Sequence, residues 1–157
     1  MTYNAIGLDA GKAQGLADAL NDLLSNYQIF YMNVRGYHWN IKGEKFFELH
    51  VKFEELYNDL LLKIDEIAER VLTLGARPTH SYSTYIGQSE IPERKDVSDG
   101  MEAMRNVVAG FTILLRKQRA ILSLASEADD EGTSSLMSDY LSAQEKLVWM
   151  YRSFLGE

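Results

Sequence analysis

The sequence predicts an all-α fold, a four-helix bundle with one long connection between its second and third helices. Apolar residues recur at helical spacing in four long stretches, and no stretch alternates between apolar and polar residues as a half-buried strand does. Both prolines of the 157-residue chain fall between the second and third stretches. We expect a single domain over residues 1–157, because 46% hydrophobic residues suffice for one core.

The first two helices are predicted from apolar stripes on either side of Gly43. The first stripe covers residues 16–37, and we expect a helix of roughly 28 residues there. The second stripe covers residues 46–74 and ends at Gly75, a residue type that commonly terminates helices. The two helices should therefore be joined by a short turn.

Residues 75–97 form the long connection, with a short helical turn near residues 82–86. Asp99 followed three residues later by Glu102 is typical of a capping box, so the third helix should begin there and continue to residue 125. Gly132 and Thr133 interrupt the chain, and a shorter fourth helix is expected over residues 136–154. One long crossover in this position is typical of ferritin-like bundles, which pair the first helix with the second and the third with the fourth.

The composition excludes several classes of function. The chain has no cysteine, so any metal must be held by His, Asp or Glu. A formal net charge of -7 favours attraction of cations and argues against a sequence-independent grip on nucleic acid. We expect no membrane span, because no apolar stretch is long enough, and a cytoplasmic location, because residues 1–7 lack a signal-peptide pattern.

Five residues have the spacing of a metal site: His38, His50, Glu54, Asp65 and Glu69. The last four form two pairs with i, i+4 spacing within an arc of about 100° on the second helix. The two pairs are about 22 Å apart along the helix axis, whereas a ligand sits about 2 Å from its metal. One chain therefore cannot bring the pairs together, and it also lacks the Glu-x-x-His motifs of metal sites inside ferritin-like bundles.

Two copies of the second helix that cross antiparallel about a two-fold axis near its middle would unite the pairs. His50 and Glu54 of one chain would face the partner subunit's Asp65 and Glu69, and symmetry would give two equal sites. His38 would add a second imidazole. Such ligands suit Fe(II) and also Zn(II), Mn(II) or Co(II). The alternative is that the carboxylates form a solvated helix face and the histidines are packed or exposed singly.

The order of these residues resembles that of the Dps family, also called mini-ferritins. The segments that carry the resemblance are Tyr37-His38-Trp39-Asn40, Phe46-Phe47-Glu48-Leu49-His50, Phe53-Glu54-Glu55-Leu56-Tyr57 and Asp65-Glu66-Ile67-Ala68-Glu69-Arg70. The resemblance extends to Leu74-Gly75 and to the segment around Trp149, and so covers most of the chain. Position 54 departs from the pattern, since it is Glu where the family usually has Asp, and we expect metal affinity to differ there.

The resemblance implies a hollow dodecamer that oxidises Fe(II), preferentially with hydrogen peroxide, stores the ferric mineral and protects against oxidative stress. A two-iron ferroxidase centre would be bound by His38, His50 and Glu54 of one subunit with Asp65 and Glu69 of its neighbour. Trp39 matches a family tryptophan beside this centre. It either intercepts stray radicals or acts as a large anchor at a helix end or interface.

Two further expectations concern DNA and the path of iron into the shell. Family members often bind DNA through Lys-rich tails, but here only Lys12 precedes the first helix and the chain closes with Leu155-Gly156-Glu157, so we expect weak or no direct DNA binding. Residues 129–131 form either part of an acidic three-fold pore or a solvated turn, and the family pore residues fall slightly later, near Gly132 and Ser135. The alternative functions are a nucleoid-associated shell that protects DNA and a helical oligomer with a structural zinc or manganese site.

Overall fold

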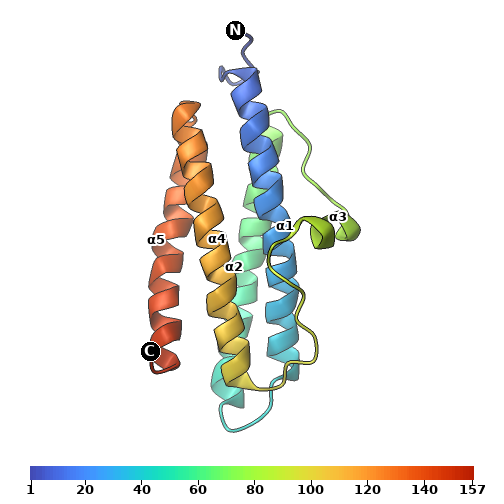
Figure 1. The fold of residues 1–157 in the computed structure, drawn as a ribbon, viewed down its shortest axis with the longest axis vertical. Helices are drawn as coiled ribbons and strands as arrows, with labels where there is room; N and C mark the ends of the chain where they lie inside the picture. Colours follow the sequence, from blue (N-terminus) through green and yellow to red (C-terminus); the bar gives the residue numbers. More distant parts are fainter.

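Four long helices and one short helix form the computed structural model, which describes all 157 residues. The helices are α1 (Ala10–Asn40), α2 (Phe46–Thr73), α3 (Tyr82–Gln88), α4 (Gly100–Glu127) and α5 (Glu131–Phe154). α1 packs against α2, α4 packs against α5, and α1 also packs against α4, which confirms the predicted all-α bundle and its helix pairing (Figure 1). None of these helices has a stretch long and apolar enough to cross a membrane.

α1 and α4 begin where an aspartate side chain caps the helix. Asp9 accepts a hydrogen bond from the backbone N–H of Lys12 at 2.9 Å, and Asp99 accepts one from that of Glu102 at 2.9 Å. The second contact confirms the predicted start of the third helix. α1 is longer than predicted, with 31 residues, and Lys12 lies inside its first turn, where Nζ donates to the carbonyl of Glu127.

The predicted start of the last helix at Leu136 is wrong, because α5 begins at Glu131. Gly132 and Thr133 lie in its first turn and do not interrupt the chain. The reason for the glycine is a contact distant in sequence: a Cβ at position 132 would lie 2.7 Å from the guanidinium of Arg70 on α2. Glycine here makes room for a side chain of another helix.

Asp130 caps α5 and is buried, with 2% of its surface exposed. Its carboxylate accepts hydrogen bonds from the backbone N–H of Thr133 at 3.0 Å and from the Arg70 guanidinium at 2.6 Å. Asp130 is thus neither part of a solvated turn nor free to line a pore. Both roles expected for residues 129–131 are therefore wrong for this residue. Asp129 and Glu131 are exposed, and the prediction of a pore now concerns those two residues of the segment.

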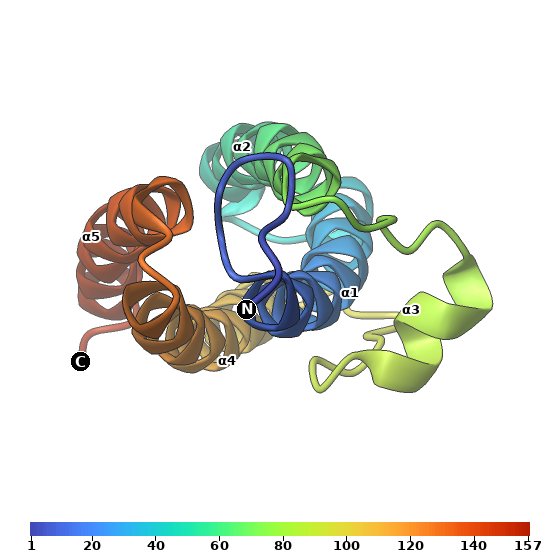
Figure 2. The ribbon, with the colours of Figure 1, turned by 90° about the horizontal axis from the view of Figure 1, so that it is seen from above.

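The long crossover is held to α1 by asparagine side chains. Asn26 Oδ1 accepts hydrogen bonds from the backbone N–H groups of Glu90 at 3.0 Å and Ile91 at 3.1 Å. Asn33 Oδ1 accepts one from the N–H of Arg94 at 3.0 Å. Viewed along the bundle, the crossover carries α3 outside α1, away from α5 (Figure 2). The short helical turn predicted near residues 82–86 is confirmed as α3.

A neutral polar network lies in the centre of the bundle. The Tyr27 hydroxyl donates to Gln118 Oε1 at 2.5 Å and accepts from Gln144 Nε2 at 2.8 Å, and Gln118 Nε2 donates to Gln144 Oε1 at 2.8 Å. All three side chains are buried, and burial raises the pKa of Tyr27, so its phenol stays neutral. The network joins α1, α4 and α5 without placing a charge in the core.

We expect Tyr27→Phe to lower the free energy of unfolding by about 1–3 kcal/mol, because Gln118 and Gln144 would each lose a buried hydrogen-bond partner. Denaturant unfolding followed by circular dichroism at one fixed protein concentration measures this change. Tyr3→Phe is the matched control, since Tyr3 is 62% exposed. Equal effects of the two substitutions would show that the network does not stabilise the bundle.

Candidate metal centre

His38 at the end of α1 and His50 in the first part of α2 are in direct contact. Their rings are stacked, with centroids 3.7 Å apart and planes inclined by 11°. Nδ1 of His38 lies 2.7 Å from the carbonyl oxygen of His50, and Nδ1 of His50 lies 2.7 Å from that of His38. The turn between the helices passes through Gly43 at φ 117°, a conformation that favours glycine.

These reciprocal hydrogen bonds fix the position of one proton on each ring. A carbonyl oxygen can only accept a hydrogen bond, so each Nδ1 carries the proton and donates it. In its neutral form each ring then has its lone pair on Nε2, and this form of histidine binds a metal. The carbonyl of His38 has no backbone partner at the end of α1, so the His50 ring also satisfies a group that the helix leaves free.

Glu54 is the carboxylate closest to the histidine pair. Its Oε1 lies 3.9 Å from Nε2 of His38, and its side chain is 54% exposed whereas that of His38 is 8% exposed. Phe46 stacks on His50 with centroids 4.9 Å apart, and Tyr57 meets His38 edge to face at 5.3 Å. The imidazoles are held between aromatic rings, with Nε2 of His38 near a solvated carboxylate.

Asp65 and Glu69 lie farther along α2, and both are exposed. The helical rise places Asp65 about 22 Å from His50 along the axis. No group of three metal-binding side chains is formed within one chain. The chain thus stacks His38 on His50, places Glu54 3.9 Å from Nε2 of His38 only, and leaves Asp65 and Glu69 at a distance.

The outer face of α2 carries large apolar side chains as well as these carboxylates. At about 100° per residue, five exposed apolar residues lie on the same side as Glu54, Asp65 and Glu69. They are Phe47, Val51, Leu61, Leu62 and Leu72. An exposed apolar surface of this kind is typical of a site of protein association.

Comparison with known proteins identifies the family. Residues 17–157 match the family described as "Ferritin-like domain". The DNA protection during starvation protein of Porphyromonas gingivalis is 42% identical over 148 residues, which cover 94% of this chain and 93% of that protein. The crystal structure of the DPS protein from Vibrio cholerae O1 is 62% identical with a TM-score of 0.97, covering 99% of this chain and 98% of that chain. The chain belongs to the Dps family of ferritin-like proteins.

Family membership confirms the resemblance found in the sequence. The Vibrio cholerae Dps protein is described as a member of a broad superfamily of ferritin-like diiron-carboxylate proteins. A second solved structure, the Dps protein from Bacillus brevis, is 34% identical with a TM-score of 0.89, covering 92% of this chain and 97% of that chain. The five predicted ligands of this Dps chain remain a prediction, which the geometry of the histidine pair supports.

Trp39 follows His38 at the end of α1 in this Dps chain and is 57% exposed. The guanidinium of Arg35 lies 4.8 Å from the centroid of its indole ring. The sequence pointed to Trp39 but did not reveal Arg35 over its ring, nor Phe46 and Tyr57 against the two histidines. The contact between Arg35 and Trp39 could have been predicted from their spacing of four residues on α1, because such residues share a helical face.

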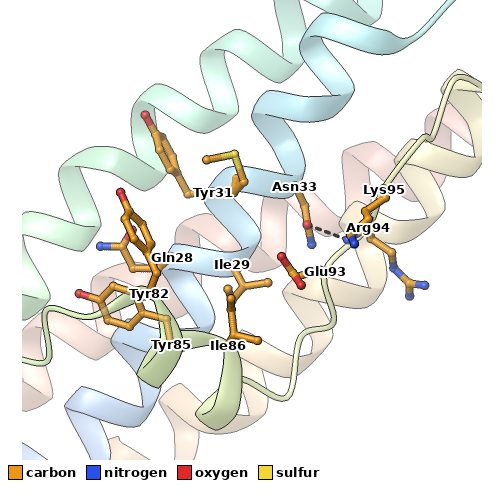
Figure 3. A pocket seen from close by; sticks show the side chains of 11 residues that line it. Gln28, Ile29, Tyr31, Asn33, Tyr82, Tyr85, Ile86, Glu93, Arg94 and Lys95 are labelled. Atoms are coloured by element: carbon orange, nitrogen blue, oxygen red, sulfur yellow. Dashed lines mark hydrogen bonds between the residues drawn. The ribbon is translucent and has the colours of Figure 1, made fainter.

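The candidate centre of this Dps chain does not coincide with its pockets. A hollow of about 330 Å³ lies between α1, α3 and residues 93–95 of the crossover (Figure 3), and a more apolar one of about 590 Å³ is lined by residues of α2, α4 and α5. None of the five predicted ligands lines either hollow. The candidate ligands therefore lie outside both hollows.

We expect the neutral rings of His38 and His50 in metal-free protein to carry their proton on Nδ1, because each Nδ1 donates to a carbonyl. Solid-state NMR of protein labelled with ¹⁵N-histidine reports the tautomer. His80→Gln removes the third, exposed histidine and leaves the two signals of interest. A proton on Nε2 of either ring would contradict the geometry.

Proposed function

We propose that this Dps-family protein is an iron-sequestering ferroxidase that oxidises Fe(II), preferentially with hydrogen peroxide, and stores the ferric product in a dodecameric shell. The observation that carries the proposal is the stacked histidine pair, in which both Nε2 atoms are free to bind a metal beside Glu54. Iron is the substrate of this reaction and the cargo of the shell. Zinc, manganese or cobalt would fit the same donors.

Each site is proposed to lie between two subunits. His38, His50 and Glu54 come from one subunit, and the partner subunit's Asp65 and Glu69 complete the set, so that a pair of subunits holds two equal sites. The exposed apolar residues on the same face of α2 support this arrangement, because association would cover them. Two ferrous ions would share the five ligands.

The ligands would stabilise the oxidised metal more than the reduced one. Three carboxylates bring negative charge to a site whose two metal ions gain one positive charge each on oxidation, and opposite charges at short distance attract strongly. Two ferrous ions each give up one electron, and hydrogen peroxide takes both electrons with two protons to form two water molecules. The hydroxyl radical, which forms when peroxide takes a single electron, is thereby avoided.

Two residues have roles of a different kind. Glu54 replaces the aspartate usual in the family, and its longer side chain reaches within 3.9 Å of His38 Nε2 while more than half of it stays in solvent. Metal affinity at that position is expected to differ from that of relatives with aspartate. Trp39 is proposed as a ring next to the centre that one-electron oxidants reach early, and it is not a ligand.

We expect Asp65→Asn combined with Glu69→Gln to abolish rapid iron oxidation by peroxide while leaving assembly nearly intact. Protein loaded with Fe(II) under anaerobic conditions receives peroxide or air, and ferric absorbance is recorded. Wild-type protein should react fast with peroxide and slowly with air. Glu48→Gln with Glu55→Gln is the matched control, since it removes the same charge from exposed positions of α2. Normal rates in the first variant would refute the ligand assignment.

Mixed assemblies test whether the site is shared. Subunits with Asp65→Asn and Glu69→Gln are assembled at random with subunits carrying His50→Ala and Glu54→Gln. Half of the two-fold pairs then combine both types and hold one intact site of two, so about a quarter of wild-type activity should return. An absence of recovery in well-mixed shells would place the site within one subunit.

A second candidate function follows from the name of the Porphyromonas gingivalis relative, a DNA protection during starvation protein. A shell of this kind could protect DNA by surrounding or compacting it. The formal net charge of -7 on each chain argues against direct binding, because phosphate would be repelled. Tight binding to duplex DNA in a shift assay at physiological salt without divalent cations would favour this second function.

A rise in melting temperature with zinc or manganese, without iron oxidation, would favour a structural metal instead.

A further inference from the structure

Arg70, in the last part of α2, is bound by two side chains at the start of α5. Its Nη2 donates to Oδ1 of Asp130 at 2.6 Å, and its Nε donates to Oγ1 of Thr133 at 2.9 Å. The Thr133 hydroxyl in turn donates to Oδ2 of Asp130. We call these three side chains the Arg70 clamp. All of its contacts lie within one chain, and Asp130 and Thr133 are buried there, so the clamp does not depend on a partner subunit.

The clamp fixes the guanidinium in one orientation. An arginine presents its donors in a rigid plane, and here Nε and Nη2 are used on two different acceptors. Gly132 leaves the space for this orientation, because a Cβ there would lie 2.7 Å from Nη1 and from Nη2. A lysine has a single nitrogen and could not bind Asp130 and Thr133 with the same geometry.

The clamp joins two helices that belong to different pairs. α2 packs on α1 and α5 packs on α4, whereas α2 and α5 do not pack closely on each other (Figure 2). Among the ion pairs of the chain, only the one between Arg70 and Asp130 links α2 to the start of α5. The position of the last part of α2 relative to the second helix pair therefore depends on the clamp.

Two predicted ligands lie on the segment that the clamp holds. Glu69 directly precedes Arg70, Asp65 lies five residues before it, and α2 ends at Thr73. Helix ends open more easily than helix middles, because their last carbonyls lack partners within the helix. Successive residues of a helix point about 100° apart, so Arg70 can reach α5 while the two carboxylates are exposed on another side. The clamp thus restrains the ligand segment without contacting the ligands.

We propose that Arg70 is a positioning residue for the shared metal site, which holds the last part of α2 so that Asp65 and Glu69 reach a metal bound at the partner subunit's His50. This inference rests on the proposed function, since it requires a site between two subunits. Arg70 binds no metal, because a guanidinium offers donors and no lone pair. It acts through geometry, and ligands misplaced by more than about 0.5 Å bind a metal poorly.

Mixed assemblies separate positioning from a general loss of stability. Carboxylate donors are subunits with His50→Ala and Glu54→Gln, and histidine donors are subunits with Asp65→Asn and Glu69→Gln. Each two-fold pair of unlike subunits then holds one complete site. Arg70→Lys is added either to the carboxylate donors or to the histidine donors, and reference shells keep the arginine in both. Lysine retains the positive charge beside the buried carboxylate, so the change is mainly one of geometry.

In shells with Arg70→Lys in the carboxylate donors, we expect the Kd for Co(II) to rise about tenfold, as is typical when a group that orients metal ligands is replaced. Co(II) is the probe because it fits the same donors, and its visible absorption under anaerobic conditions reports binding. The same substitution in the histidine donors should leave the Kd close to that of the reference shells. A merely structural role would weaken both arrangements equally, because each contains the same share of substituted subunits.

Hydrogen exchange of metal-free protein gives a second readout. In Arg70→Lys, amides of residues 65–73 should exchange faster than in wild type, because the end of α2 loses its attachment to α5. Amides of residues 46–56 should exchange as in wild type, since they lie at the other end of the helix. This comparison needs neither a metal ion nor mixed shells.

Gly132→Ala displaces the guanidinium from the other side and should have the same two effects, although alanine ordinarily favours a helix over glycine. It also keeps the test available if the lysine variant does not assemble. Gly15→Ala is its control, because a Cβ at that position of α1 meets nothing within 4 Å. Arg119→Lys is the control for the lysine substitution, since Arg119 pairs with an exposed carboxylate of α5.

Equal Kd values for the two placements of Arg70→Lys would overturn the inference. Unchanged hydrogen exchange over residues 65–73 in both Arg70→Lys and Gly132→Ala would overturn it as well. If the reference shells bind no Co(II) at the shared site, the inference fails together with the proposed arrangement of ligands. Iron oxidation is not part of the test, so failure of the ferroxidase assay alone would refute the proposed activity without changing these affinities.

Discussion

The two hydrogen bonds between His38 and His50 join the end of α1 to the beginning of α2, and the candidate centre depends on them. They select one tautomer for each ring, align the rings in a stack and satisfy a carbonyl that the helix end leaves free. The same contacts therefore stabilise a helix terminus and leave Nε2 of each ring, the nitrogen proposed to bind a metal, without a hydrogen-bond partner in the chain. Loss of either imidazole would disturb both functions, so effects on stability and on metal binding at these positions are coupled.

The candidate ligands of this bundle lie outside its central core. The centre of the fold is occupied by Tyr27, Gln118 and Gln144, which satisfy one another and carry no charge. A metal-binding interior would require buried carboxylates, and Asp130, the buried carboxylate of the chain, is already paired with Arg70. The three carboxylates proposed as ligands on α2 are instead exposed, and in the proposed arrangement each subunit presents an incomplete set that its partner completes.

The sequence was sufficient to predict features that depend on local spacing. The apolar stripe of α2, the Asp99 cap and the common helical face of the site carboxylates all follow from residues a few positions apart. The start of α5 could not be predicted this way, because Gly132 reads as a helix breaker until Arg70 is known to lie against it. The burial of Asp130 and the surroundings of Arg35 likewise depend on contacts that spacing alone does not specify.

The contact between Arg70 and Gly132 links the evolution of two distant positions. A side chain at position 132 would collide with the guanidinium, and a shorter residue at position 70 would leave Asp130 buried without its cation. A substitution at Arg70 or at Gly132 alone would therefore destabilise the fold. A residue that a relative tolerates at one of these positions would be harmful when it is transferred singly into this chain. Position 70 also directly follows the predicted ligand Glu69. Packing therefore restricts which residues can be substituted next to the candidate metal centre.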